Sequence, residues 1–242
     1  MTHPDPFVRS AFERAQRNRE GTAFHEAGHV AAAWRLGVGI RGRVTIAPDL
    51  TCWGSAAVGK RISDATFFEV LSRASLGLEI RPRARSDLEA QIIVLNAGRL
   101  AHGRAIRDGE AVVEPIPTDP VEREWLPGVL LMERLAVNTA RDAAGLPRAR
   151  SDDEQAWALL MTLSAGRVEE ANAYGGWLWE RTRWLVDGEP FWTITRAAAK
   201  ALLRHETLSA TATRKVARDA LRPEISPEFS SYVLEPPSGR RP

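Results

Sequence analysis

Cysteine and long apolar runs are what this sequence has least of. Cys52 is the only cysteine among 242 residues, so no internal disulfide can form, and this fits a reducing compartment. No stretch of about 20 apolar residues is present, so we expect no membrane span. The N-terminus also lacks the basic and apolar regions of a signal peptide. We therefore expect a cytoplasmic protein.

The chain also has little net charge. Its 33 Lys and Arg residues nearly balance its 31 Asp and Glu residues, which leaves a formal charge of +2. Such a balance produces no strong field for an anionic polymer, and no recognition motif accompanies the local arginine clusters. We expect no nucleic-acid partner. Hydrophobic residues make up 44%, as is ordinary for a globular protein.

One short segment carries a pattern typical of zinc chemistry. Residues 22–34 contain His25, Glu26 and His29 as His-Glu-x-x-His. Positions four apart share one face of a helix, so both histidines can offer a ring nitrogen to one Zn²⁺ ion. Water on zinc ionises near pH ~7, and a neighbouring carboxylate can accept its proton. The pattern predicts a zinc site with Glu26 as general base. Two packed histidines without a metal are the alternative, because the motif also arises by chance.

This segment resembles a known family. His-Glu-Ala-Gly-His followed by Val-Ala-Ala is similar to the zinc helix of the FtsH family of ATP-dependent metalloproteases. Further similarities occur in the family's order, in the blocks 22–59, 88–101, 151–165 and 200–217. One departure follows the Ala-Gly-Arg at 97–99, where His102 and Gly103 replace two acidic residues. Neither His102 nor His205 has a spacing that links it to the first two histidines, so we expect neither to be a ligand.

The resemblance implies a mainly α, multi-helix metallopeptidase domain over residues 1–221. It also implies a small β-hairpin after the zinc-binding helix, with strands near 43–47 and 53–59. The edge of that hairpin either binds substrate as an added strand or simply covers the core. About 105–148 would be an insertion relative to the family, and the five prolines of residues 222–242 predict a flexible C-terminal tail.

Hydrophobic periodicity and capping signals locate the helices. A capping-box pattern at 86–89 predicts that one core helix starts near residue 90. Trp177, Trp179 and Trp184 have helical spacing, and we expect them to pack in the core. The predicted helices are 5–18, 22–36, 63–77, 90–100, 121–144, 152–165, 168–186, one starting at 189, and 210–221.

The third zinc ligand is the main ambiguity. Catalytic zinc sites usually have three protein ligands and one open position. The resemblance implies an aspartate at the start of a later helix, within Ser-Asn-Asp. Aligning Ser151 with that serine makes Asp153 the ligand and puts Asp152 where the family has asparagine. Acidic residues also suit the first turn of any helix, so this cluster could be only a helix start. Asp87 is the leading rival, and Asp152 also stays open.

The sequence thus predicts a zinc-dependent metalloendopeptidase that acts on polypeptides. His25, His29 and Asp153 would bind Zn²⁺, and Glu26 would be the catalytic base. The chain contains no Gly-x-x-x-x-Gly-Lys-Ser/Thr phosphate loop, so an ATPase would have to be a separate partner. A homo-oligomer is implied by the resemblance only. The alternatives are a non-catalytic interaction protein that retains the FtsH peptidase fold and a hydrolase of non-peptide amides.

Overall fold

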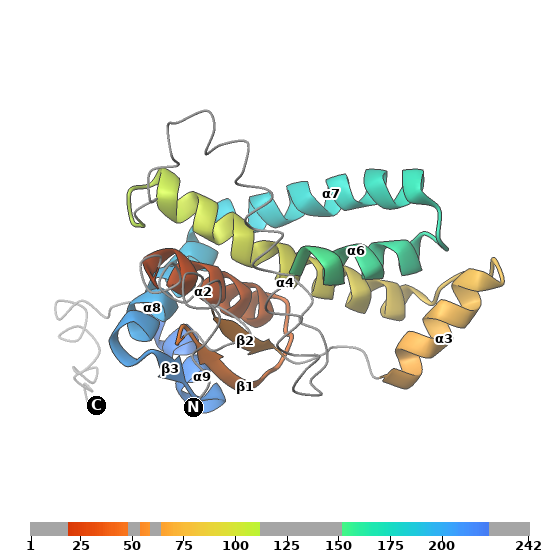
Figure 1. Cartoon of the computed structure of the whole chain (residues 1–242). Coiled ribbons are helices and arrows are strands. Elements are labelled where there is room, and N and C mark those ends of the chain that lie inside the picture. The colour runs from red at the N-terminus through yellow and green to blue at the C-terminus, as the bar shows by residue number, and fades with distance from the viewer. Residues whose placement is uncertain (1–18, 48–53, 59–63, 112–151, 223–242) are drawn as a thin grey trace, which may run out of the picture.

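The computed structural model describes residues 19–47, 54–58, 64–111 and 152–222 (Figure 1). Over these ranges the chain is mainly α-helical, with seven helices and one three-stranded antiparallel sheet. None of the helices in these ranges is long and apolar enough to cross a membrane. The helices predicted at 5–18 and 121–144, most of the predicted insertion and nearly all of the predicted tail lie outside the described residues.

The elements follow the order helix, hairpin, helices, short strand, helix. Their bounds are α2 Arg19–Arg35, β1 Ile40–Thr45, β2 Ser55–Val58, α3 Asp64–Ser75, α4 Pro82–Arg107, α6 Asp152–Leu163, α7 Val168–Asp187, α8 Glu189–His205, β3 Thr207–Leu208 and α9 Ala210–Ala220. The mainly α class and the hairpin directly after the first of these helices are confirmed.

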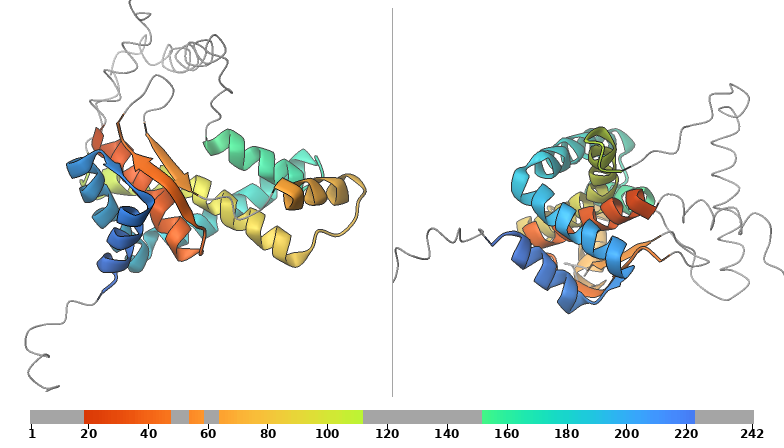
Figure 2. Two further views of the ribbon diagram at one scale, coloured as in Figure 1. Left: turned by 90° about the horizontal axis from the view of Figure 1, so that it is seen from below. Right: turned by 90° about the vertical axis from the view of Figure 1, so that its left-hand side faces the viewer.

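Helix α2 lies at the centre of the fold. It packs most extensively on α4 and α8, and it also contacts β1, β2 and α9 (Figures 1 and 2). Every residue from 21 to 33 is buried except His25, which is half-buried. A helix enclosed in this way needs small or apolar residues on all sides, which explains its run of alanines. Glu26 is the only acidic residue in the buried part of α2.

The sheet has the strand order β2-β1-β3. β1 pairs with β2 through Val44 and Ala56, and with β3 through Val44 and Leu208. The third strand is a finding that the sequence did not predict. It forms because α8 ends at His205, and the φ of 58° at the next residue, Glu206, turns the backbone into line with β1. Once the chain has turned, the backbone N–H of Ile46 donates to the carbonyl of Glu206 at 2.9 Å.

Helix α4 is much longer than predicted. It begins at Pro82 rather than near residue 90, so Ser86 and the rest of the expected capping box lie inside the helix. Proline at the first helical position has a preset φ, which favours this earlier start. Ala84 and Leu88 are buried, so the roughly two added turns are also held by packing. The helix continues to Arg107, and the first residues of the predicted insertion therefore belong to it.

The long α4 joins two hydrophobic cores. One core surrounds α2 and includes Ala97 and Ala101 of α4 together with Trp192 of α8. Trp192 is fully buried, and its ring stacks on Phe24 of α2 at a centroid distance of 5.7 Å. The other core lies among α3, α4, α6 and α7, where α4 supplies residues such as Leu88. Figure 1 shows α6 and α7 alongside α4, with α3 and α9 at opposite ends of the molecule.

The expectation that three tryptophans of α7 pack in the core is wrong for two of them. Trp177 is 47% exposed and Trp184 is 80% exposed, whereas Trp179 is half-buried. The buried stripe of α7 consists of Ala171, Leu178, Thr182 and Val186. These positions already define one face of the helix, so Trp177 and Trp184 fall outside it.

Replacing Gly28 by alanine is expected to lower the free energy of unfolding by about 1–3 kcal/mol, as overpacking does. A Cβ atom at Gly28 would lie 2.6 Å from both the Ala97 carbonyl oxygen and the Ala101 methyl group, so α2 and α4 would be forced apart. Gly103→Ala is the control, because among the described residues, and apart from the surrounding backbone of α4, no heavy atom lies within 4 Å of a Cβ at that position. It should raise stability by up to about 1 kcal/mol through helix propensity. Denaturant unfolding measures both changes, and equal stability of the two variants would contradict this close packing.

Candidate metal centre

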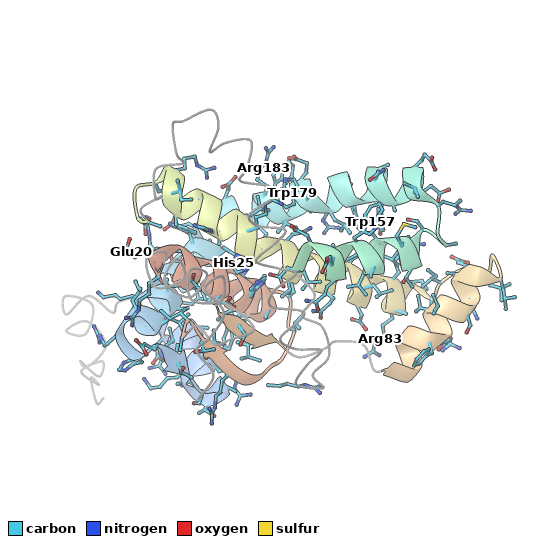
Figure 3. All side chains as sticks on the ribbon, in the orientation of Figure 1. Glu20, His25, Arg83, Trp157, Trp179 and Arg183 are labelled. Carbon is cyan, nitrogen blue, oxygen red and sulfur yellow. The ribbon has the colours of Figure 1, made fainter. Side chains whose placement is uncertain are left out.

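Three potential ligand atoms meet where α2 approaches the first turn of α6. His25 Nε2, His29 Nε2 and Asp152 Oδ2 form a triangle in which every side is 3.1 Å. The two histidines come from one face of α2, as their spacing predicts, and Asp152 is the first residue of α6. Figure 3 shows His25 reaching from α2 toward the start of α6. This group of His25, His29 and Asp152 could hold a metal ion.

The size of this triangle suits zinc. Ligand atoms about 2.0–2.1 Å from a tetrahedral zinc ion lie about 3.3 Å from one another. The observed separations of 3.1 Å are close to that value. Two imidazole nitrogens and one carboxylate oxygen are also a common donor set of catalytic zinc sites, which leave a further position open. The donor atoms therefore fit the metal that the sequence predicts.

A backbone carbonyl of α4 fixes the orientation of His29. The Nδ1 atom of His29 lies 2.7 Å from the carbonyl oxygen of Val94, which can only accept a hydrogen bond. Nδ1 must therefore carry the proton, and in the neutral ring the lone pair is on Nε2, the atom that faces His25 and Asp152. In metal-bound histidines, the ring nitrogen that does not bind the metal typically donates such a hydrogen bond to a carbonyl.

Without a metal, the same atoms hold a proton tightly. Burial lowers the pKa of His29, but the hydrogen bond and charge of Asp152 outweigh it, with help from Glu26, and raise that pKa to about 9. Burial likewise raises the pKa of Asp152, but the hydrogen bonds from His25 and His29 outweigh it and hold that pKa well below its usual range. A cation at the centre of the triangle is thus strongly favoured, and a proton on His29 takes that role when no metal is bound.

Glu26 lies beside the triangle and is almost fully buried, with 5% exposure. Burial raises the pKa of its carboxyl group, and the positive charges of His29 and His25 partly oppose that rise. Its Oε1 atom faces the residue before β2, because a Cβ at Gly54 would lie 2.8 Å from it. The carboxylate is therefore placed between the potential metal ligands and the sheet.

The structure differs from the sequence-based assignment at the third ligand. Asp152 reaches the histidines, whereas the side chain of Asp153 is 65% exposed and lies 3.4 Å from Arg99. Successive helical residues point about 100° apart, so only one of the two aspartates can face α2. Asp87 is about 16 Å along α4 from Gly98, the residue that contacts the histidines, and it does not belong to the group.

The two other histidines within the described ranges, His102 and His205, are not members of this group. His102 is half-buried on α4, and burial together with the charge of His25 lowers its pKa. His205 is exposed in the last turn of α8. The prediction that neither joins the ligand atoms agrees with their positions. Two features that sequence reasoning missed, the Val94 carbonyl and the close approach of Gly98, belong to the backbone and have no side-chain signature.

Comparison of the chain with protein-family models gives no match, and comparison with curated proteins gives none at a significant level. The relation to FtsH proteases therefore stays a prediction from the motifs.

Substituting Asp152 by asparagine is expected to weaken zinc binding by at least about 100-fold, because an amide oxygen replaces the charged ligand. Asp153→Asn is the matched control and should change the affinity by less than about threefold, since an exposed pair such as Arg99–Asp153 contributes little. Zinc per polypeptide and competition with a chromophoric chelator measure both. A larger loss in Asp153→Asn would restore the assignment from the sequence.

Metal-free protein is expected to lose stability as the pH rises from 6.5 to 9.5. The pKa of His29 is about 9 in the folded state and near 6.5 when unperturbed, so its contribution is complete below pH 6.5 and disappears as the pH passes 9. The loss is at most about 3 kcal/mol. Denaturant unfolding in the presence of EDTA measures it, with His29→Gln as a control that should give a flatter profile. Identical profiles for the two proteins would show that His29 does not carry this proton.

Proposed function

We propose that this chain is a zinc-dependent metalloendopeptidase in which His25, His29 and Asp152 bind the metal and Glu26 is the general base. One observation carries the proposal: three ligand atoms converge at 3.1 Å directly beside a buried carboxylate that is not itself one of them. A purely structural zinc site would close the fourth position with another protein ligand, whereas here the neighbouring group is an acid–base catalyst.

Zinc in such a site polarises a carbonyl group and acidifies water. Glu26 takes the proton from the attacking water and returns it to the nitrogen of the leaving amine. Its burial supports this role, because a carboxyl group with a raised pKa is closer to the pH at which it has to gain and lose a proton. Val94 keeps the ring of His29 in the required tautomer.

The substrate of this proposal is an extended polypeptide. β2 is one of the two outer strands of the described sheet, and it begins next to Gly54, which faces Glu26. An extended segment that pairs with this edge would pass in front of the base. This position supports the substrate-binding interpretation of the hairpin over the interpretation in which the hairpin only covers the core.

The similarity to FtsH peptidase domains supports the same function. The zinc helix, the hairpin after it and an aspartate at the start of a later helix occur in the order that the resemblance implies. A separate ATPase and a homo-oligomer remain proposals based on that resemblance alone. The alternative, a non-catalytic interaction protein, gives no reason for a buried acid beside the ligand atoms, because burying a carboxylate is costly even where nearby charges partly offset that cost.

Replacing Glu26 by glutamine is expected to leave about one zinc ion per chain and to reduce peptide-bond cleavage by about 10²–10⁴-fold, the usual contribution of a general base. Cleavage of a flexible protein such as casein, with and without a chelator, measures activity. Glu20→Gln is the matched control, since Glu20 is an exposed carboxylate on the same helix, and it should retain both zinc and activity.

Two outcomes of this experiment would count against the proposal. Undiminished cleavage by Glu26→Gln would remove Glu26 from the mechanism. Zinc-loaded wild-type protein that cleaves no peptide would favour the non-catalytic alternative, or a hydrolase of non-peptide amides if such a substrate is turned over.

A further inference from the structure

Helix α4 passes within van der Waals distance of both histidines at Gly98. A Cβ atom at this position would lie 2.5 Å from His29 Nε2 and 2.6 Å from His29 Cε1, and it would lie 2.9 Å from His25 Nε2. The two nearest atoms belong to one imidazole, so a methyl group would press on the ring edge that carries the potential ligand nitrogen. Real Cβ atoms essentially never approach other heavy atoms this closely.

The same edge of the ring is bonded to α4 at its other nitrogen. His29 Nδ1 donates to the Val94 carbonyl at 2.7 Å, and Val94 precedes Gly98 by about one helical turn. The Nδ1–Cε1–Nε2 edge of the imidazole therefore lies along one turn of α4, bonded at Nδ1 and facing Gly98 at Cε1 and Nε2. A side chain at Gly98 would push the ring away from the turn, and the hydrogen bond to Val94 and the position of Nε2 would change together.

We infer that Gly98 is a positioning residue. Because it has no side chain, the His29 ring can lie directly against α4, which we call the seating of the ring, and the Nε2 atoms of His25 and His29 then converge with Asp152. Alanine at residue 98 would keep every ligand and still weaken metal binding. The inference rests on the proposed metal site for its zinc measurement, but the seating of the ring can be tested on metal-free protein.

A double-mutant cycle tests the seating. Gly98→Ala is expected to lower the melting temperature in the presence of EDTA, because the methyl group collides with the imidazole. In a His29→Ala background the two closest atoms are absent, and only His25 Nε2, at the end of a half-buried side chain, remains within 3 Å of the added methyl group. The same substitution should therefore lower the melting temperature much less. An equal decrease in the melting temperature in both backgrounds would overturn the inference. If Gly98→Ala alone fails to fold, the experiment is still informative, because the double variant should then recover folding.

Zinc affinity tests the consequence for the metal. Gly98→Ala should bind zinc about 10–100-fold more weakly than the wild type, a loss comparable to that of disturbed outer-shell partners. Gly103→Ala should bind zinc as the wild type does, since a Cβ at that position in the same helix meets nothing within 4 Å. Unchanged affinity in Gly98→Ala would overturn the inference.

The two hypotheses fail in different ways. Wild-type protein that binds no zinc would contradict the proposed function. A much smaller effect of Gly98→Ala in the His29→Ala background would still support the role of Gly98 in seating His29. Wild-type protein that binds zinc, with no difference between Gly98→Ala and Gly103→Ala, would contradict the role of Gly98 and leave the proposed function intact.

Discussion

The close approach of α2 to α4 is the constraint on which the rest of this structure depends. Side chains normally keep two packed helices apart, and here glycines remove them at two points. Gly28 of α2 lies against Ala97 and Ala101, and Gly98 of α4 lies against the imidazoles of His25 and His29. The first contact closes the core and the second shapes the candidate metal centre, so a single interface determines both stability and chemistry.

Charge favours a cation at the candidate metal centre. The side chain of Glu26 is buried, and that of Asp152 is 32% exposed and bonded to both histidines. An ionised Asp152 beside neutral histidines would leave an unbalanced charge in a site of low polarity, and an ionised Glu26 would add a second, which is costly. Without a metal, a proton on His29 offsets the charge of Asp152, and burial raises the pKa of Glu26. A dication would balance both carboxylates, and the three ligand atoms could hold one.

Much of the fold and of the candidate metal centre could be predicted from the sequence, because these features depend on local residue spacing. His25 and His29 share a helix face as their four-residue separation requires, and most helix bounds agree within a few residues. The choice between Asp152 and Asp153 could not be predicted, since it depends on how α6 is rotated against α2. The early start of α4 and the strand Thr207–Leu208 depend on packing and pairing with distant segments, and the exposure of Trp184 depends on which face of α7 meets α4.

The separation of the ligands along the chain has a consequence for how the protein is made. His29 and Asp152 are 123 positions apart, and β1, β2, α3 and α4 all lie between them. A metal that joins them closes a long loop, and such a clip restricts the unfolded chain far more than a local site would. A nascent chain that ends before Asp152 offers only the two histidines. Tight metal binding would therefore have to wait for α6 to dock, and a bound ion would then hold α2 and α6 together late in folding.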